Sequence, residues 1–412
     1  MFHEEIKRFD INRKPKKQSP FLMPIIWGAS FPANIFNRVK IKKLGMEGLK
    51  PPYLLLCNHN AFRDFLVAAE ANFPHRANSV VAIDGFIGIE WLLRAVGGIC
   101  TRKFVSDTTL VKQMKRVVQG GQIAVLYPEA RYSLCGTNAV LPESLGKLAK
   151  FLGVPVAALV INGHHVAAPF WNRKRRNLSK TEAVMTKIID KDELKALSVS
   201  EINERINASL VYDDFKWQRE NGIIIDEPFR AEGLHKVLYK CPACNTEYKM
   251  DSKGTELFCK ECGTRWEMTT LGELSAKEGE TEFSHIPDWY EWERAEVRKE
   301  IEEGRYCFEA DTEVEWLPNA KGFIKIGRAR LVHNADGFLL KGSYGGEDYE
   351  VVRTTPSIYS CHIEYNYKKK GDCIDLNTST DTFYIYPKDC DFSVTKIALA
   401  TEELYFHYIN NK

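Results

Sequence analysis

Residues 54–64 of the chain read Leu54-Leu55-Leu56-Cys57-Asn58-His59-Asn60-Ala61-Phe62-Arg63-Asp64. An apolar strand is expected to end at Asn58, and a helix to follow over 61–73 with Asn60 as its N-cap. Residues five positions apart lie roughly 140° apart on a continuous helix, so only a turn can bring His59 back to Asp64. A histidine whose tautomer is fixed by a carboxylate suits a general base. Taken alone, the pair also fits a partly buried histidine beside a surface aspartate.

Strand and helix patterns alternate between residues 47 and 235. Apolar or β-branched runs predict strands at 53–58, 79–83, 99–102, 123–127, 154–161 and 183–189. Periodic runs, several of them ended by glycine, predict helices at 61–73, 89–96, 108–119 and 142–152. This alternation predicts an α/β domain with a central, mostly parallel sheet. Functional residues gather past the carboxyl ends of such strands, where His59, Arg102 and Glu129 fall.

Four ordered blocks of sequence carry a resemblance to a known family. They are His59-x-x-x-x-Asp64, Gly97-Gly98-Ile99-Cys100-Thr101-Arg102, Tyr127-Pro128-Glu129-Ala130-Arg131-Tyr132-Ser133 and Val154-Pro155-Val156. Together they resemble the glycerolipid acyltransferases, and above all the lysophosphatidic acid (1-acyl-glycerol-3-phosphate) acyltransferase group. The resemblance covers residues 20–235 of the 412.

The resemblance implies transfer of an acyl group from a thioester to a hydroxyl of a lysophospholipid or similar glycerolipid. The family's histidine is the general base and its aspartate orients that histidine, which implies these roles for His59 and Asp64. The arginine of the second block binds the acceptor's phosphate, a role implied for Arg102. Acyl-CoA or an acyl-carrier protein is the implied donor. The remaining implied substrate-binding residues, from the third and fourth blocks, are Pro128, Glu129, Arg131 and Pro155.

General chemistry supports these roles, but the third block departs from the family pattern. An alcohol is a weak nucleophile at neutral pH and needs a nearby base, and arginine forks match a phosphomonoester. The commoner form of the block is Phe-Pro-Glu-Gly-Thr-Arg-Ser, whereas this chain has Ala130 in place of the glycine and an arginine, Arg131, one place earlier. Because alanine disfavours left-handed backbone, we expect a different turn at Ala130. The sequence therefore indicates the reaction class better than the acceptor.

Two Cys-x-x-Cys pairs form the second strong motif: Cys241 with Cys244, and Cys259 with Cys262. This is the spacing of a tetrahedral four-thiolate zinc site. The stretch between the pairs is expected to form a hairpin, as in a zinc ribbon. Because four cysteines leave no open coordination position, the predicted zinc is structural rather than catalytic.

A catalytically inactive zinc-ribbon adaptor that binds protein or nucleic acid is the alternative function. The ribbon's basic side chains, Lys249, Lys253, Lys260 and Arg265, are offset by Glu247, Asp251, Glu256 and Glu261. A dedicated nucleic-acid surface is one-sidedly basic. The charge pattern thus argues against a nucleic-acid partner.

Five segments are expected along the chain. They are an N-terminal helical, membrane-surface segment (1–46), an acyltransferase domain (47–235), a zinc ribbon (236–272), a linker and helix (273–304) and a β-rich domain (305–412). The last segment has strand-like runs at 323–326, 329–332, 337–340, 349–353, 358–365, 373–376 and 382–386, then a helical pattern over 393–409. An antiparallel, pleckstrin-homology-like domain with a terminal helix is predicted.

Composition and the N-terminal region bear on location. A net charge of +2 gives no information on a polyanionic partner, and the apolar run at 21–32 is too short to span a bilayer. That run follows the basic residues 14–17, which suits an anchor on an anionic membrane surface, but it also suits a helix packed on its own domain. Residues 1–5 are charged and lack a signal-peptide pattern. We therefore expect a cytoplasmic protein, peripheral on the inner face of the membrane with membrane lipids as partners, its eleven cysteines free or metal-bound.

Overall fold

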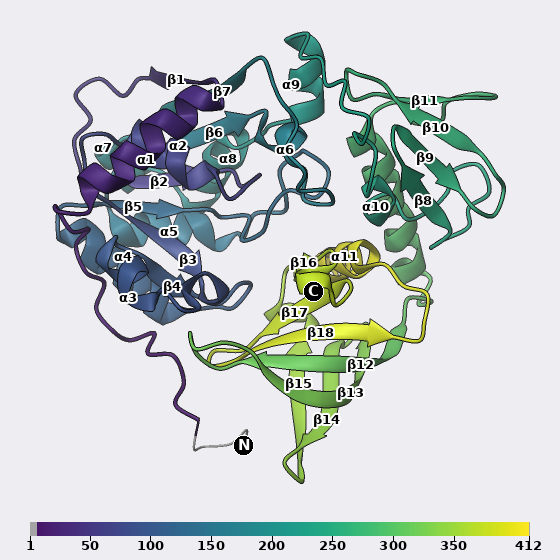
Figure 1. The fold of residues 1–412 in the computed structure, drawn as a ribbon. Coiled ribbons are helices and arrows are strands. Elements are labelled where there is room, and N and C mark those ends of the chain that lie inside the picture. Colours follow the sequence, from purple (N-terminus) through teal and green to yellow (C-terminus); the bar gives the residue numbers. More distant parts are fainter. Residues whose placement is uncertain (1–5, 412) are drawn as a thin grey trace. The chain divides into compact units, whose positions relative to one another are not determined.

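The computed structural model describes residues 6–411, so the N-terminal residues used in the signal-peptide argument, 1–5, lie outside it. The chain divides into two compact units (Figure 1). The α/β unit comprises residues 10–101 and 107–225. Among the described residues, the C-terminal unit comprises 6–9, 102–106 and 226–411. The short segment 102–106 thus groups with the C-terminal unit, although the residues on either side of it belong to the α/β unit.

A seven-stranded sheet forms the centre of the α/β unit (Figure 1). Its strands are β1 (Val39–Leu44), β2 (Leu54–Cys57), β3 (Ala77–Ala82), β4 (Ile99–Thr101), β5 (Ile123–Leu126), β6 (Val156–Asn162) and β7 (Thr181–Ile189). Their order across the sheet is β1-β7-β6-β2-β5-β3-β4. The five strands from β6 to β4 run parallel, while β7 is antiparallel to β6 and pairs in parallel with β1. The predicted central, mostly parallel sheet is confirmed, and the antiparallel pairing of β7 with β6 was not predicted.

Strand β2 is buried on both faces of this sheet, which explains its unbroken apolar sequence. Leu54 and Leu56 enter one core, together with side chains of α4 (Thr108–Gln119), α5 (Ser144–Leu152) and α8 (Val199–Ser209). Leu55 and Cys57 enter the other core, together with side chains of α2 (Asp64–Ala71). The other helices of the unit are α1 (Met23–Phe36), α3 (Glu90–Ala95), α6 (His164–Ala167), α7 (Lys191–Ala196) and α9 (Asp214–Glu220).

Two local predictions in this unit were wrong. Helix α2 begins at Asp64, and its N-cap is Arg63 rather than Asn60. Asn60 is unable to cap the helix because its side chain donates to the carbonyl of Ile161 and accepts from the hydroxyl of Tyr212. In addition, residues 39–44 form the edge strand β1, although they were assigned to an N-terminal helical segment. The three lysines of this strand are typical of a protected sheet edge.

The four-cysteine region has its own four-stranded antiparallel sheet. Its strands are β8 (Met250–Lys253), β9 (Glu256–Cys259), β10 (Arg265–Met268) and β11 (Leu274–Ala276), in the order β11-β10-β9-β8. Strands β8 and β9 form the predicted hairpin, which turns at Gly254 with a φ of 63°. Strand β11 occupies the start of the segment predicted to be a linker.

A seven-stranded antiparallel sheet and two helices make up the rest of the C-terminal unit. The sheet has the order β15-β14-β13-β12-β18-β17-β16. Its strands are β12 (Phe308–Leu317), β13 (Ile324–Asn334), β14 (Gly337–Tyr344), β15 (Glu347–Thr354), β16 (His362–Glu364), β17 (Cys373–Asn377) and β18 (Thr382–Lys388). The helices are α10 (Ile286–Glu302) and α11 (Val394–Asn410), joined by Arg294 to Glu402 at 2.7 Å and Arg298 to Glu403 at 2.7 Å. The antiparallel sheet and closing helix are confirmed, and the pleckstrin-homology-like assignment stays a prediction.

The strand count in this sheet agrees with the prediction only because two errors cancel. The runs at 323–326 and 329–332 belong to the single strand β13, which continues through Gly327 with a φ of 94°. Strand β12 was not predicted, although Thr312, Val314 and Trp316 alternate with charged residues and are buried. This alternation is the pattern of a strand with one solvated face.

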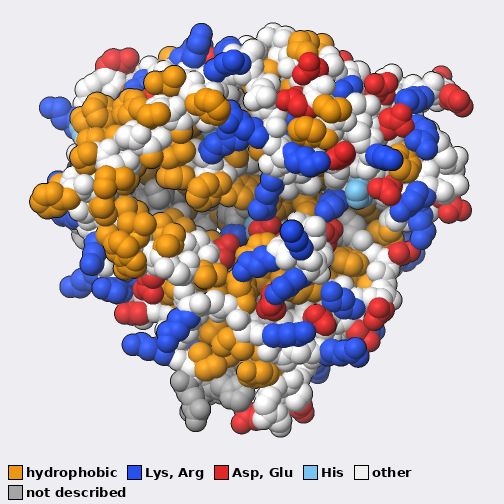
Figure 2. Space-filling view, in the orientation of Figure 1, with side chains coloured by type: hydrophobic (Ala, Val, Ile, Leu, Met, Phe, Trp, Pro, Cys, Tyr) orange, Lys and Arg blue, Asp and Glu red, His pale blue; other side chains and the backbone are white. Residues whose placement is uncertain are grey.

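Apolar side chains are exposed on part of the α/β unit. Figure 2 shows them gathered over the region where α1 and α2 lie in Figure 1. The exposed large side chains on and around these two helices are Phe21, Ile25, Ile35, Phe36, Phe62, Phe65 and Phe73. No helix within residues 6–411 is long and apolar enough to cross a membrane.

Candidate functional site around His59

The candidate site lies at the carboxyl ends of three neighbouring parallel strands. His59 follows β2, Glu129 follows β5 and His164 follows β6, and these strands lie in the order β6-β2-β5. Because the loops after parallel strands emerge at one edge of the sheet, residues far apart in sequence come together there. The sheet topology thus places the three side chains at one edge.

His59 and Asp64 form a hydrogen-bonded pair. The Nδ1 atom of His59 lies 3.0 Å from Oδ2 of Asp64. The same oxygen accepts backbone N–H groups from Asn60 at 2.7 Å and Ala61 at 2.9 Å. Asp64 is fully buried, which by itself raises its pKa, but hydrogen bonds from His164 and His59 outweigh burial and hold that pKa well below its usual value. Asp64 is therefore ionised at neutral pH and can orient the imidazole.

The ring of His59 lies between two tyrosines. Its centroid is 4.5 Å from that of Tyr127 and 4.4 Å from that of Tyr132. With Nδ1 donating to Asp64, the second ring nitrogen, Nε2, carries the lone pair of the neutral imidazole. The His59 side chain is 24% exposed. A partly exposed imidazole of fixed tautomer can accept a proton from a bound hydroxyl.

Glu129 supports the other side of the His59 turn. Its carboxyl oxygens accept the backbone N–H of His59 at 3.3 Å and of Ala139 at 3.1 Å, and the hydroxyl of Tyr212 lies 3.4 Å from both oxygens. Burial raises the pKa of Glu129 to about 8 despite these donors and the nearby Arg131. Glu129 is thus largely protonated at neutral pH and acts as a buried polar support.

Arg102 follows β4, the outermost strand on one side of the sheet. Strand β4, which precedes it, is separated from β2 by β5 and β3, so their ends are roughly 14 Å apart at the usual strand spacing. Arg102 itself belongs to the C-terminal unit. Its guanidinium donates there to the carbonyls of Leu317, Pro318 and Thr380 and to the hydroxyl of Thr382. Its predicted contact with a phosphate would have to replace or extend these bonds.

The other residues predicted from the third and fourth blocks are spread over both edges of the sheet. Pro128 and Arg131 are buried beside Glu129, after β5. Pro155 precedes β6, and its carbonyl accepts the N–H of Leu54 at the first residue of β2. Pro155 thus lies at the amino end of the strands, opposite the edge that carries His59. Its implied substrate-binding role stays a prediction.

The backbone of the third block is left-handed at Ala130. Its φ is 54°, a conformation that glycine adopts easily and that costs a residue with a Cβ about 1–2 kcal/mol. The expected difference from the family's turn stays a prediction.

Two functional candidates, His164 and Tyr212, were not predicted from the sequence. The Nδ1 atom of His164 lies 2.6 Å from Oδ1 of Asp64, and the hydroxyl of Tyr212 lies 3.0 Å from Oδ1 of Asn60. His164 follows a predicted strand of the parallel sheet. Because functional residues gather past the carboxyl ends of such strands, its position could have predicted a role. Tyr212 lies between helices in an unpatterned region, and nothing in the local sequence marks it.

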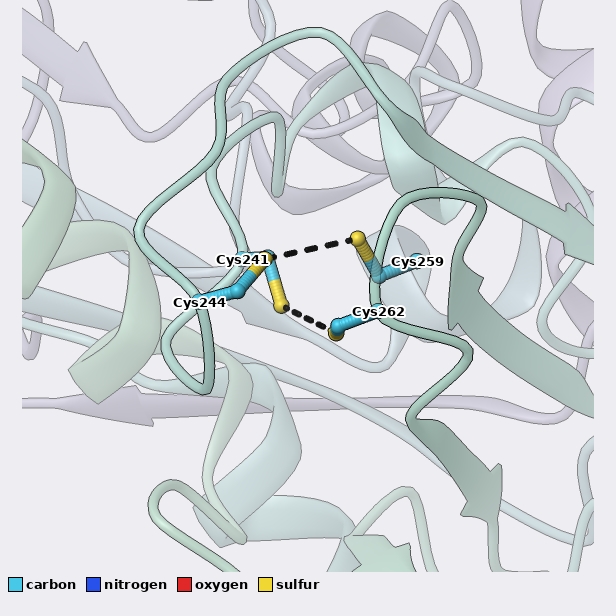
Figure 3. A group of neighbouring side chains, drawn as sticks. All are labelled: Cys241, Cys244, Cys259 and Cys262. Carbon is cyan, nitrogen blue, oxygen red and sulfur yellow. Dashed lines mark hydrogen bonds between the residues drawn. The ribbon is translucent and has the colours of Figure 1, made fainter.

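The four cysteines form a second candidate site, a metal-binding group (Figure 3). All four sulfurs lie within 4.8 Å of one another. The Sγ atoms of Cys241 and Cys262 are 3.7 Å apart, and those of Cys244 and Cys259 are 3.8 Å apart. A tetrahedron with Zn–S bonds of about 2.3 Å has edges of about 3.8 Å, so the sulfurs fit a metal such as zinc.

The two Cys-x-x-Cys turns are built alike. The carbonyl of Cys241 accepts the N–H of Asn245 at 2.8 Å, and the carbonyl of Cys259 accepts the N–H of Gly263 at 3.1 Å. Asn245 and Gly263 have φ values of 61° and 79°, so each turn ends in left-handed backbone. The hydroxyl oxygens of two matching threonines lie near the second cysteine of each pair: Thr246 3.3 Å from Cys244 Sγ, and Thr264 3.2 Å from Cys262 Sγ.

Comparisons with known proteins include a distant likeness among solved structures. No family model matches the chain, and no curated protein matches its sequence. Among solved structures, it is similar to the 1-acyl-sn-glycerophosphate (LPA) acyltransferase PlsC from Thermotoga maritima, with a TM-score of 0.33 and 17% sequence identity. The match covers 45% of this chain and 78% of that chain. At this TM-score the likeness does not by itself assign a fold or an activity.

Proposed function

We propose that the protein is an O-acyltransferase that moves a fatty acyl group from a thioester to a hydroxyl of a lysophospholipid or similar glycerolipid. The observation that carries the proposal is the hydrogen bond between His59 Nδ1 and the buried, ionised carboxylate of Asp64. It leaves the second ring nitrogen of a partly exposed imidazole as the base. The four ordered sequence blocks agree with this reaction class.

In the proposed reaction His59 transfers one proton. Its Nε2 atom takes the proton of the acceptor hydroxyl as the oxygen attacks the thioester carbonyl. Asp64 stabilises the resulting imidazolium. The tetrahedral intermediate then expels the thiolate, which receives the proton from His59, so an ester and a free thiol leave the site. No covalent acyl-enzyme is needed, and Cys57 is unsuited to form one, because it is fully buried and burial raises the pKa of its thiol well above the usual value.

The acceptor and donor sites are less defined than the base. The resemblance places the phosphate of a phosphorylated acceptor on Arg102, which already binds backbone carbonyls. A glycerolipid without a phosphate is therefore the alternative acceptor to lysophosphatidic acid. Acyl-CoA and an acyl-carrier protein both remain candidate donors.

The proposal also has a membrane-surface part and a metal part. The exposed apolar side chains around α1 and α2 would enter the headgroup region of a cytoplasmic membrane face, where lipid acceptors reside. Arg175 is exposed and lies 4.3 Å from the ring centroid of Phe36, which suits a contact with anionic headgroups. The four cysteines would hold one structural zinc ion, with no part in the transfer itself.

Thioester consumption by purified full-length protein tests the proposal. Lysophosphatidic acid and a neutral monoacylglycerol are compared as acceptors, each with acyl-CoA and with acyl-carrier protein. Turnover with lysophosphatidic acid alone would support the phosphate role of Arg102. Turnover with the neutral lipid alone would keep the reaction class and remove that role. Absence of turnover with every pair would favour the inactive adaptor.

A further inference from the structure

The two carboxylate oxygens of Asp64 are held very differently. Oδ2 receives three donors, the His59 ring and the N–H groups of Asn60 and Ala61. Oδ1 receives one, Nδ1 of His164 at 2.6 Å. Among residues 6–411 no other group donates to Oδ1. One of the four hydrogen bonds that orient the carboxylate, the one on Oδ1, therefore comes from a residue one hundred positions away in sequence.

His164 is itself held firmly by the backbone around it. It begins α6, directly after Gly163, whose φ is 94°. The buried carboxylate of Asp214 accepts the N–H of Gly163 at 2.9 Å and of His165 at 2.8 Å, one residue on either side of His164. A Cβ added at Gly163 would lie 3.0 Å from the ring of Trp217, so the chain has little room to shift. The His164 side chain is only 3% exposed.

We infer that His164 is a positioning residue for the proposed base, acting on His59 through Asp64. The inference rests on the proposed function of His59. A carboxyl group turns readily about its terminal bond, and the donor on Oδ1 opposes this rotation together with the three donors on Oδ2. The carboxylate then presents Oδ2 to His59, which fixes the imidazole tautomer that leaves Nε2 as the base. His164 does not reach reacting atoms, because its Nδ1 is used on Asp64 and its Nε2 is buried.

The adjacent histidine provides a matched control. His165 is as buried as His164, but its ring packs against Trp171 and Phe215, with centroids 5.0 and 5.8 Å away. Neither nitrogen of its ring meets a hydrogen-bond partner among the described residues. The same substitution at 164 and at 165 therefore separates loss of the Asp64 contact from loss of a buried imidazole.

The test uses the full chain with ¹⁵N-labelled histidine, and reads the His59 ring by NMR together with thioester consumption. The variants are His164→Leu, which removes the donor, His164→Asn, which keeps an N–H near the Nδ1 position, and His165→Leu. We expect wild type, His164→Asn and His165→Leu to hold His59 as the Nδ1–H tautomer. In His164→Leu we expect a mixture of tautomers and a kcat about tenfold lower, with KM unchanged.

Two results would overturn the inference. One is a His59 tautomer that is the same in His164→Leu as in wild type. The other is an equal loss of kcat in His164→Leu and His165→Leu, which would indicate a packing effect. Should His164→Leu not fold, a His164→Asn variant with a wild-type His59 spectrum would support the inference, and one with mixed tautomers would refute it. Absence of turnover in wild type with a clear NMR difference would instead refute the proposed function while keeping the positioning role.

Discussion

The four-cysteine group and the site around His59 are both arranged by polar side chains, but they are encoded in opposite ways. All four sulfurs come from one short stretch, between Cys241 and Cys262, folded by two similar turns. The His59 site is assembled from loops after three strands and from Tyr212, far along the chain. Local spacing therefore reveals the whole of the first site and only the nearest pair of the second.

The largest effect is expected from a substitution in the four-cysteine group. Cys259→Ser should abolish metal binding, because the predicted zinc has no substitute for a buried thiolate. Metal binding to such sites is worth on the order of 10 kcal/mol and is coupled to folding. Mass spectrometry would measure the metal content, and near-ultraviolet circular dichroism would measure the loss of folded structure. Cys390→Ser, at an exposed thiol outside the group, is the control and should keep one zinc per chain. Equal metal content in both variants would contradict the assignment.

The second-largest effect is expected from the buried Glu129 of the His59 site. Its folded pKa of about 8 lies above the ordinary value of 4.5, so the folded state holds a proton that the unfolded state releases. Stability of the wild type should therefore fall as pH rises from about 4.5 to about 8, by up to about 5 kcal/mol from this group. Glu129→Gln lacks this proton and should lose less stability over that range. Urea unfolding at pH 5 and pH 8 compares the two proteins, and parallel pH dependences would refute a protonated Glu129.

The smallest effect concerns the strained turn next to Glu129. Ala130→Gly should stabilise the protein by about 1 kcal/mol, because glycine adopts a φ of 54° without a Cβ clash. Ala208→Gly, at an exposed position of α8, is the matched control and should destabilise it by about 0.5–1 kcal/mol. Thermal unfolding should show a higher Tm than wild type for Ala130→Gly and a lower Tm for Ala208→Gly. A destabilised Ala130→Gly would indicate that the turn is held for another reason.

The accuracy of each prediction depended on how far apart in sequence the interacting residues lie. The elements with strong periodicity, such as α4, and the buried strands β2 and β5 were predicted closely, because each pattern reflects its own burial. The N-cap at Asn60 was predicted wrongly, because its side chain bonds to Ile161 and Tyr212, which no local pattern shows. His164 has a partial signal, its place after a predicted strand, but its bond to Asp64 spans one hundred residues and appears in no local pattern. The position of Arg102 depended on strand order, which the sequence alone does not specify.

The most direct test of the account is thioester consumption by wild type, His59→Ala and His75→Ala. His75 is an exposed histidine of the same unit and controls for the loss of any imidazole. The account predicts turnover by wild type and His75→Ala, and a rate at least about 100-fold lower for His59→Ala, the usual contribution of a general base. Equal rates in wild type and His59→Ala would contradict the central claim that His59 is the base.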